Sequence, residues 1–356
     1  MKIHRIHLLK AGPIEDRVID LGDAWTGGTH ERVLFTGPNG TGKSTILRAI
    51  AFLWDMTGQW LATPDVRPTG RSEARSWLRS HVEAVGLIVS DVPGIGGTIG
   101  LYFGTSEHLE KIRSEAEFWM GEIDAKPEGK GRPRLVHYDH REWMRSWSQA
   151  YSVLRLGSIE PSTANGFRTP NIIYLEAEER RWVRAKGDPA KPVADDPALR
   201  WLVTYKPAED WEGQVESSLI ALKILNEPEY HRILEDLNRF FVGKKIRAQP
   251  TEKLRLLVDV TTRDGAIHHP LDELSSGERQ ILIQLYLISR WLQPGGIVLL
   301  DEPDLYLHPS LIRIFLSRVE AIVAERKGQL LITSHLPEIW REYETKAHRE
   351  KLGGEL

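Results

Sequence analysis

Cysteine is missing from this sequence, and its absence excludes several kinds of chemistry at once. None of the 356 residues is a cysteine, so there are no disulfides, no thiolate zinc sites, no iron–sulfur clusters and no catalytic thiol. A chain without cysteine suits the reducing cytoplasm, and we expect a cytoplasmic protein.

Long apolar runs are also missing. The longest are Ile297–Leu300 and Ile281–Ile288, which contains Gln284, whereas a membrane-spanning helix needs about 20 apolar residues. The first six residues, Met1–Ile6, include lysine, histidine and arginine and lack the apolar core of a secretion signal. We therefore expect a soluble protein that does not itself enter a membrane.

A strong excess of charge of either sign is absent. The 47 basic and 50 acidic residues give a net charge of -3, which argues against a wholly basic protein that coats DNA. A local basic groove stays compatible with this balance. The hydrophobic fraction of 41% is that of an ordinary globular protein, and the length predicts one large domain with insertions or two domains.

The hydrophobic pattern predicts an α/β fold. Alternating or continuous apolar residues indicate strands, and apolar residues three and four apart indicate helices. The predicted strands are 3–9, 18–21, 32–35, 84–89, 98–103, 171–175, 254–260, 297–300 and 330–333. The predicted helices are 44–54, 107–121, 141–156, two within 208–241 that include 230–241, and 276–291, with another that begins at Pro309. No heptad pattern extends over several turns, so we expect no long coiled-coil arm.

A complete phosphate-binding motif follows the third predicted strand. Residues 37–44 match G-x-x-x-x-G-K-[ST] between an apolar strand and a helix. Glycines let backbone N–H groups face phosphate oxygens, Lys43 supplies a positive charge, and the Ser44 hydroxyl is placed to bind Mg²⁺. The motif predicts a nucleoside triphosphate site. Its predicted binding residues are Gly37, Pro38, Asn39, Gly40, Thr41, Gly42, Lys43, Ser44 and Thr45.

A second motif is the apolar strand 297–300, which ends in two carboxylates, Asp301 and Glu302. A strand buried on both faces reads as continuous aliphatic residues. Asp301 at its tip can hold Mg²⁺, and Glu302 can polarise the attacking water, a division of roles that suits phosphoryl transfer. The acidic residue at 302 predicts hydrolysis of the nucleotide as well as binding.

A serine-rich helix start and a histidine complete the set. Ser275, Ser276 and Gly277 precede Glu278, and their N–H groups can form an anion site. Ser275 lies 26 residues before Asp301, and His335 lies 34 residues after it. A lone serine–glycine cap or a lone histidine is weak evidence, and the order and spacing of the four segments give them weight.

Together these segments resemble an ABC-type ATPase head. In that family the serine-rich signature reaches across a dimer to the γ-phosphate in the partner's phosphate loop, and the histidine contacts the γ-phosphate within its own chain. The resemblance implies a P-loop core with an N-terminal antiparallel β subdomain and a helical lid. It also implies ATP and Mg²⁺ as cofactors and a homodimer closed by ATP. It assigns catalysis to Lys43, Glu302 and His335, the metal to Ser44 and Asp301, and binding of the partner's nucleotide to Ser275, Ser276, Gly277 and Glu278.

The residues after Glu302 separate the branches of that family. The form D-E-P-x-x-x-L-H-P at 301–309 resembles SMC/RecF/OLD-like heads, which include many bacterial anti-phage ATPases. Transporter subunits carry a different segment there and a coupling glutamine after the phosphate loop. The candidates for that glutamine, Gln59 and Gln149, lack matching surroundings, so an ABC transporter subunit is the disfavoured alternative. No nuclease segment is visible in the 21 residues after His335.

The motifs divide the chain into five predicted parts. These are an N-terminal ATPase lobe at 1–57, an insertion at 58–165, a strand that returns to the core at 166–186, a helical lid at 187–255 and a C-terminal ATPase lobe at 256–356.

Basic and aromatic residues gather outside the motifs. The clusters are Arg180, Arg181, Trp182, Arg184 and Lys186; His140, Arg141, Trp143, Arg145 and Trp147; and Lys244, Lys245 and Arg247. Such residues can bind nucleic acid or dock a protein, but we interpret each cluster singly as a solvated helix face with buried tryptophans. Eight of the twelve tryptophans lie between 54 and 201, where we expect the partner surface.

The sequence thus predicts a head-to-tail dimer that hydrolyses ATP and controls a separate effector, a nuclease or a toxin, in anti-phage defence or DNA repair. Contact with nucleic acid is compatible with it. The alternative from another class is a scaffold that uses ATP only to hold a dimer together, and Glu302 argues against it.

Overall fold

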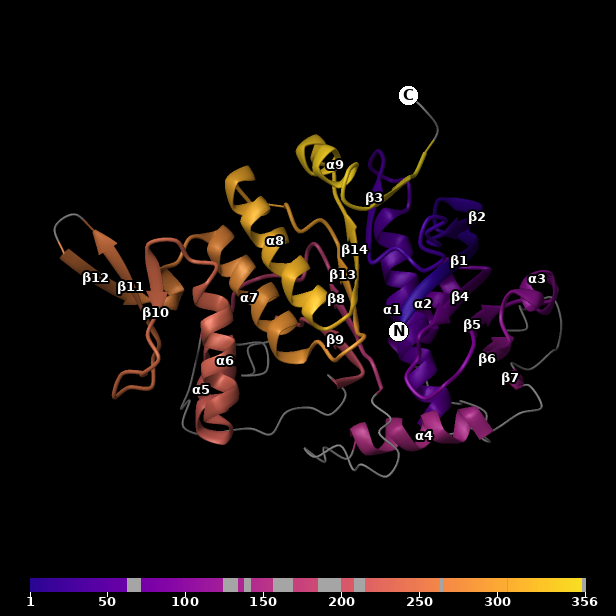
Figure 1. Ribbon diagram of the computed structural model, residues 1–356, viewed down its shortest axis with the longest axis horizontal. Coiled ribbons are helices and arrows are strands. Elements are labelled where there is room, and N and C mark those ends of the chain that lie inside the picture. Colours follow the sequence, from indigo (N-terminus) through magenta and orange to yellow (C-terminus); the bar gives the residue numbers. More distant parts are fainter. Residues whose placement is uncertain are drawn as a thin grey trace.

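The fold is seen in a computed structural model that describes residues 1–62, 72–123, 134–137, 142–155, 169–184, 200–207, 215–262, 265–305 and 307–353. Within these residues, two six-stranded sheets and one three-stranded sheet carry helices on and between their faces (Figure 1). The fold is the predicted α/β class. None of the described helices is long and apolar enough to cross a membrane.

The central sheet is wholly parallel, with strand order β15-β3-β14-β13-β8-β9. Its strands are β3 (Arg32–Thr36), β8 (Ile172–Leu175), β9 (Leu202–Thr204), β13 (Ile297–Leu300), β14 (Gln329–Thr333) and β15 (His348–Lys351). Both faces are buried, which explains the continuous aliphatic runs. Ile297 and Leu299 enter the core shared with the N-terminal half, whereas Val298 and Leu300 enter the core of the C-terminal half.

The second six-stranded sheet has the order β2-β1-β4-β5-β6-β7 and is antiparallel except between β5 and β6. Its strands are β1 (Lys2–Ala11), β2 (Ile14–Asp20), β4 (Ala84–Ser90), β5 (Ile99–Gly104), β6 (Phe118–Ile123) and β7 (Arg134–His137). The third sheet is antiparallel and projects from the far side of the molecule (Figure 1). Its strands are β10 (Lys244–Ile246), β11 (Leu257–Thr262) and β12 (Gly265–Pro270).

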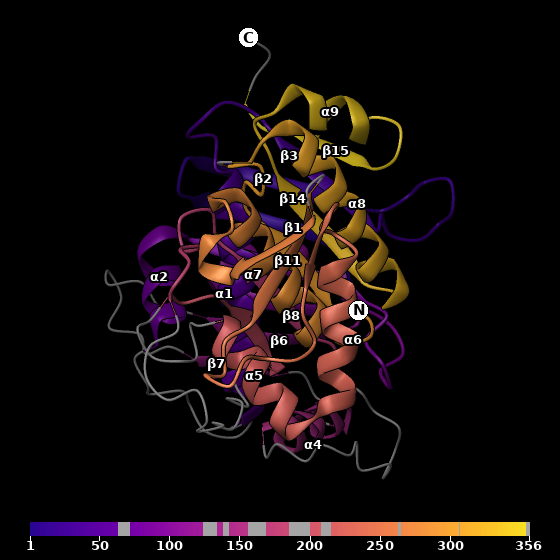
Figure 2. The same ribbon diagram turned by 90° about the vertical axis from the view of Figure 1, so that its left-hand side faces the viewer.

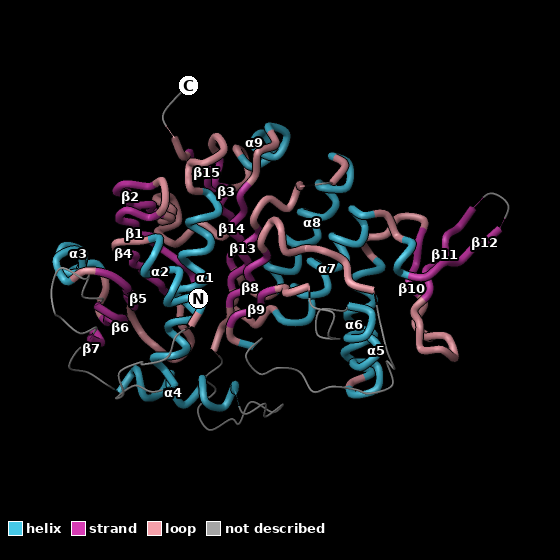
Figure 3. The backbone as a smooth tube through the Cα atoms, turned by 180° about the vertical axis from the view of Figure 1, so that it is seen from behind, coloured by secondary structure: helices cyan, strands magenta, loops and turns pink. Residues whose placement is uncertain are grey.

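Helix α1 (Lys43–Ala62) lies between the two large sheets and contacts strands of both (Figure 3). Helices α2 (Glu73–His81), α3 (Ser106–Ile112) and α4 (Glu142–Arg155) belong to the same half of the molecule. The opposite face of the parallel sheet is covered by the C-terminal half, where α6, α7 and α8 pack in sequence (Figure 2). Its helices are α5 (Val215–Leu225), α6 (Glu227–Asn238), α7 (Ser276–Trp291), α8 (Pro309–Glu325) and α9 (Pro337–Tyr343).

One predicted helix is wrong. The segment 107–121 is α-helical only to Ile112 in α3, a 3-10 turn follows at Arg113–Glu115, and its end becomes β6, which pairs with β5 in parallel. The apolar run Phe118–Met120 suits a buried strand. At Gly121 a Cβ atom would lie 2.1 Å from the carbonyl oxygen of Tyr102, so the close approach of two strands requires glycine there.

Most tryptophans between 54 and 201 lie in the core, as the interpretation of buried tryptophans predicts, so these rings do not themselves form the partner surface expected in this region. Five of the eight between 54 and 201 are buried: Trp54, Trp60, Trp119, Trp147 and Trp201. Trp54 and Trp201 stack with ring centroids 4.1 Å apart, and each indole N–H donates to the other residue's carbonyl oxygen at 2.9 and 2.8 Å. By contrast Trp25, in the loop after β2, is 98% exposed.

Candidate active site at the carboxyl end of the parallel sheet

The phosphate loop connects the end of β3 to the start of α1, as its pattern predicts. Gly37, Gly40 and Gly42 all have positive φ angles, of 151°, 78° and 96°, which residues with a side chain rarely adopt. At Gly37 a Cβ atom would also lie 2.2 Å from the carbonyl oxygen of Leu352. Pro38, Asn39 and Gly40 are exposed at the tip of the loop. The loop therefore leaves its backbone open to a ligand.

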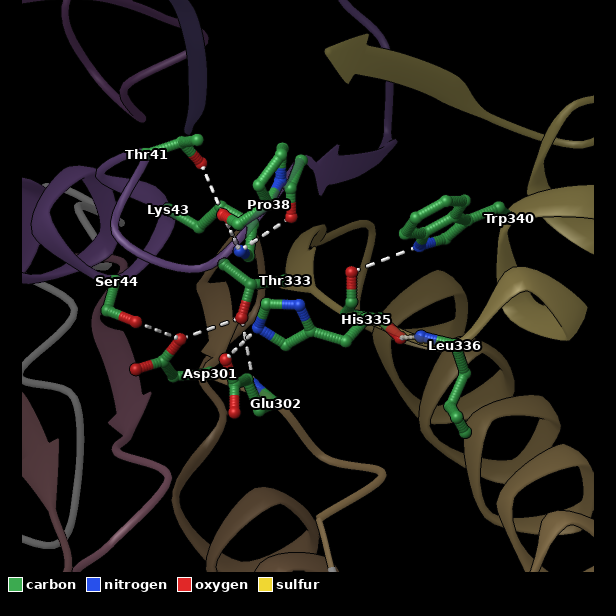
Figure 4. Close-up of polar contacts among 12 residues, drawn as sticks. Pro38, Thr41, Lys43, Ser44, Asp301, Glu302, Thr333, His335, Leu336 and Trp340 are labelled. Carbon is green, nitrogen blue, oxygen red and sulfur yellow. Dashed lines mark hydrogen bonds and ion pairs between the residues drawn. The ribbon is translucent and has the colours of Figure 1, made fainter. Parts of the chain in front are cut away.

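Lys43 folds back over this loop. Its Nζ atom donates to the carbonyl oxygens of Gly37 and Pro38, each at 2.9 Å (Figure 4). Burial lowers the pKa of Lys43, and the charges of Glu302 and Asp301 oppose that shift. Thr45 follows Ser44 on the first turn of α1 and is half-buried. The ammonium group thus lies at the loop beside the two carboxylates.

A cluster of oxygen atoms lies next to the loop. The Ser44 hydroxyl and the Thr333 hydroxyl both donate to Oδ1 of Asp301, at 2.9 and 2.7 Å (Figure 4). Burial raises the pKa of Asp301, although these two bonds partly oppose the rise. Hydroxyl and carboxylate oxygens are the donors that Mg²⁺ prefers, so Ser44 and Asp301 fit the metal predicted for them.

Glu302 and His335 form a pair across the ends of β13 and β14. Nε2 of His335 lies 2.5 Å from Oε1 of Glu302 (Figure 4). The backbone N–H of Glu302 donates to the Thr333 hydroxyl at 2.8 Å. Carboxyl ends of parallel strands share one edge of a sheet, which is where ligands bind in open α/β folds. The structure thus brings together Lys43, Ser44, Asp301, Glu302 and His335.

The serine-rich segment lies elsewhere. Ser275 is the N-cap of α7, and Glu278 completes a capping box with it: Glu278 N–H donates to the serine hydroxyl at 3.3 Å, and the serine N–H donates to the carboxylate at 3.0 Å. Burial favours a higher pKa for Glu278, but bonds from Lys244 and Ser275 outweigh it and the pKa falls. Ser275 and Ser276 are exposed, whereas Gly277 is buried. No described hydrogen bond joins this segment to the phosphate loop of its own chain.

The two candidate glutamines lie near the other end of α1. Gln59 is 16 residues after Lys43 on the same helix, which is about 24 Å at 1.5 Å per residue. Gln149 is exposed on α4, whose Ser148 hydroxyl donates to the carbonyl oxygen of Leu61. Neither glutamine reaches the phosphate loop. The residue that follows β8 at the sheet edge is Glu176, which Arg48 contacts at 2.8 Å.

Three cations of the basic clusters contact other groups within the protein, whereas Arg145, Arg181, Arg184 and Lys245 are exposed. Lys244 pairs with Glu278 at 2.7 Å, and Arg247 pairs with Asp259 at 2.7 Å. Arg180 is buried, so it is unavailable to nucleic acid. His140, Arg141 and Lys186 lie outside the described residues.

Sequence reasoning missed two residues that contact the candidate catalytic pair. Thr333 is the last residue of β14, and its position directly before Ser334 and His335 was the available signal. Arg180 was grouped with surface cations, because nothing in the local pattern shows that its guanidinium group donates to the carbonyl oxygens of Asp301 and Glu302.

Comparisons with known proteins agree with this geometry. The family described as "AAA domain, putative AbiEii toxin, Type IV TA system" matches residues 33–341, and a family described as "AAA domain" matches residues 1–59. The chain is similar to the retron Ec83 probable ATPase of Escherichia coli, with 28% identity over 191 residues, which is 48% of this chain and 33% of that protein.

A second curated relative is protein ea59 of Escherichia phage lambda, with 30% identity over 69 residues, or 19% of this chain and 13% of that protein. The chain therefore spans a third or less of the length of these relatives. Among solved structures, the SMC head domain from Thermotoga maritima has a TM-score of 0.43 at 15% identity, covering 96% of this chain and 92% of that one. An SMC head bound to the C-winged helix domain of ScpA has a TM-score of 0.48 at 14% identity, covering 94% and 90%.

The phosphate loop, the carboxylates at the edge of the parallel sheet and a family match over most of the chain all lead to one assignment. The chain belongs to the AAA-domain family described as "putative AbiEii toxin, Type IV TA system".

Proposed function

We propose that this protein hydrolyses ATP with Mg²⁺ and that it works as a head-to-tail dimer that controls a separate effector. The observation that carries the hydrolysis is the joined set of oxygens on Ser44, Asp301 and Thr333, with Glu302 beside it at the same sheet edge. A protein that only holds nucleotide has no need for a second carboxylate next to the metal position.

The chain's own residues divide the chemistry between them. Lys43 and the loop N–H groups would bind the phosphates, and Ser44 and Asp301 would hold the metal. Bound Mg²⁺ would neutralise charge on the phosphates. Glu302 orients the attacking water and accepts its proton, and His335 holds the carboxylate of Glu302 in place through their short contact. Catalysis here is mainly a matter of position and charge.

Phosphate release from ATP tests the reaction. Wild-type protein is expected to release phosphate, and EDTA is expected to stop it. Glu302→Gln keeps the shape of the side chain but removes the base, so we expect a loss of about 10²-fold or more in kcat with ATP binding retained. Glu338→Gln is the matched control, because Glu338 is exposed on α9. No turnover by wild-type protein would refute the enzyme and leave the scaffold alternative.

The position of α7 is the observation that supports the proposed dimer. This helix of 16 residues begins at Ser276, which is exposed, and it lies on the face of the parallel sheet opposite α1. Its N-terminus is suited to an anion but does not contact its own phosphate loop. A second copy placed head to tail would supply the phosphates, so each site would join Lys43, Ser44, Asp301, Glu302 and His335 with Ser276 and Gly277 of the other copy.

Sedimentation with and without ATP tests the dimer. In the Glu302→Gln background, ATP is expected to convert monomer to dimer. Ser276→Arg places a bulky cation in the interface and is expected to abolish both the dimer and turnover. Ser152→Arg, an exposed serine on α4, is the matched control and is expected to leave both intact. A Ser276→Arg protein that still dimerises with ATP would exclude the head-to-tail arrangement.

The biological output is proposed from the relatives. The matched family description names a toxin–antitoxin system, and a relative is named as a retron ATPase, which supports a role in anti-phage defence, with DNA repair as the second possibility. Coexpression with the product of the neighbouring open reading frame tests it. Wild-type protein is expected to control the toxicity or nuclease activity of that product, and Glu302→Gln to change it. Stable association with a membrane subunit would instead support the transporter alternative.

A further inference from the structure

Arg180 is a buried cation without a carboxylate partner among the described residues. Only 2% of the residue is exposed, and burial lowers its pKa to about 10, although the charge of Asp301 opposes the shift. A buried charge is costly unless hydrogen bonds compensate it. Hydrogen bonds to neighbouring groups must therefore compensate the burial of this guanidinium group.

The guanidinium group donates to the backbone of the candidate catalytic pair. Its Nη2 atom lies 2.8 Å from the carbonyl oxygen of Glu302 and 3.0 Å from that of Asp301. It also donates to the carbonyl oxygen of Ala177 at 3.1 Å. These contacts tie the segment after β8 to the turn that carries the proposed base.

The backbone at Glu302 is strained. Its φ angle is 45°, in the left-handed region that costs residues with a side chain roughly 1 kcal/mol or more. Pro303 follows, and a residue before proline strongly favours extended backbone. Such a conformation persists only where its surroundings fix it. Thr333 accepts the N–H of Glu302 and Arg180 binds its C=O, so both peptide groups that flank Glu302 are held.

The same arginine contacts α7. Its Nη1 atom donates to Oε1 of Gln284 at 3.2 Å, and Gln284 is fully buried on the second turn after Ser276. The amide of Gln284 donates in turn to the carbonyl oxygen of Gln280 at 3.4 Å. The helix that begins with the serine-rich segment is thereby connected to the turn of Glu302 through one side chain.

We propose that Arg180 is a positioning residue for ATP hydrolysis. It holds Glu302 in the left-handed conformation that directs the carboxylate toward His335, and through Gln284 it makes that position depend on the position of α7. This inference rests on the proposed function. It predicts that removing the hydrogen bonds of Arg180 lowers turnover. Nucleotide still binds, since the phosphate loop is unchanged.

Steady-state kinetics and hydrogen exchange test the proposal together. Arg180→Met and Gln284→Met are expected to lower kcat about 10- to 100-fold with KM for ATP and the affinity for a non-hydrolysable analogue within about threefold of wild type. Arg180→Lys, which keeps one donor, is expected to recover part of the kcat lost in Arg180→Met. The peptide that contains Glu302 is expected to exchange faster in Arg180→Met than in wild type.

Arg326→Met is the matched control. Arg326 also donates to a backbone carbonyl, that of Leu292, and burial also lowers its pKa, but it lies near the opposite end of β14. We expect it to lower the melting temperature without lowering kcat. Where Arg180→Met fails to fold, Gln284→Met carries the test.

The possible failures are distinguishable. A wild-type protein without turnover overturns the proposed function. A wild-type protein that turns over, together with Arg180→Met and Gln284→Met proteins that keep kcat within twofold, overturns only the role of Arg180. Equal losses of kcat and nucleotide affinity also overturn it, because they indicate general disruption of the fold.

Discussion

The two ends of α1 serve different purposes and are encoded in different ways. At its N-terminus, Lys43 and Ser44 belong to one contiguous motif that meets Asp301 and Thr333 at the edge of the parallel sheet. Toward its C-terminus, Trp54 packs against aromatic side chains from α4 and the segment before β9, and Trp60 is buried in the same core. One end carries the polar groups of the candidate active site, and the other carries apolar surface that fixes the helix between two sheets.

The comparison teaches that the sequence pattern of polar residues and that of aromatic residues carry different information about function. Phosphate chemistry needs particular atoms at fixed spacing, so the motif survives as a readable pattern. An aromatic core needs mainly volume: the indole N–H groups of Trp54 and Trp201 have partners, whereas those of Trp60 and Trp147 have none among the described residues. The members of such a core therefore come from distant segments, and their gathering in the sequence indicated a docking surface that the structure does not show for the five buried tryptophans.

The largest expected effect is the loss of stability when an aromatic side chain near the C-terminus of α1 is removed. Trp54→Ala removes a fully buried ring that stacks on Trp201 and should cost about 3–5 kcal/mol in the free energy of unfolding. Urea denaturation checks this value. The kcat of the folded fraction should stay within about threefold of wild type, because Trp54 is about 16 Å along the helix from Lys43.

Trp25→Ala is the control for that substitution. Trp25 is almost fully exposed, so its loss should leave the free energy of unfolding within about 0.5 kcal/mol of wild type. Equal destabilisation by the two substitutions would contradict the distinction between a buried aromatic core and an exposed ring.

The next largest effect is a loss of turnover when a hydroxyl at the candidate active site is removed without a change in packing. Thr333→Val keeps the shape of the side chain but removes the hydroxyl that binds Asp301 and accepts the N–H of Glu302. Residues that orient metal ligands typically contribute 10- to 100-fold to metal affinity or activity, and we expect about that loss in turnover. Phosphate release over a Mg²⁺ titration measures it.

Thr57→Val is the matched control at the aromatic end of α1. Thr57 is also fully buried, and its hydroxyl donates to the carbonyl oxygen of Leu53 within the helix. We expect kcat and the Mg²⁺ requirement to match wild type within about twofold. A similar loss in both valine variants would show that the hydroxyl of Thr333 has no special role.

The pH dependence sharpens the comparison at the metal position. Burial raises the pKa of Asp301, and Mg²⁺ binds the carboxylate form. As the pH falls through this raised pKa, the Mg²⁺ concentration needed for half-maximal turnover should rise by up to about tenfold per pH unit. The rise should begin at a higher pH than an exposed aspartate would give. ATP titrated alone with Mg²⁺ corrects for protonation of the nucleotide, and a requirement that is constant after this correction would contradict the prediction.

The smallest expected effect comes from replacing Gln149, one of the two candidates for a coupling glutamine. Gln149→Ala changes an exposed residue on α4 near the aromatic end of α1, so turnover should stay within about twofold of wild type and stability within about 0.5 kcal/mol. Glu176→Gln is the informative partner, since Glu176 follows β8 at the sheet edge. A large loss of turnover in Gln149→Ala would contradict this prediction and indicate that Gln149 takes part in the reaction.

Much of the fold could be predicted from the sequence. Strand β13 and helix α7 have the predicted bounds, because a doubly buried strand and a capped amphipathic helix leave strong local patterns. The segment 107–121 could not be predicted, since the strand β6 depends on its neighbour β5, and neither Trp119 nor Gly121 marks that pairing locally.

The sequence by itself determined the motifs of the candidate site: a phosphate loop, two adjacent carboxylates and a histidine, at spacings that permit few other interpretations. Only the tertiary structure decided which hydroxyl supports Asp301, that Arg180 is buried against the strained turn of Glu302, and that the tryptophans fill a core. The reason is physical. A motif is contiguous and records its function in the order of its residues, whereas the environment of Arg180 or Trp201 depends on segments about 100 residues or more away in the chain.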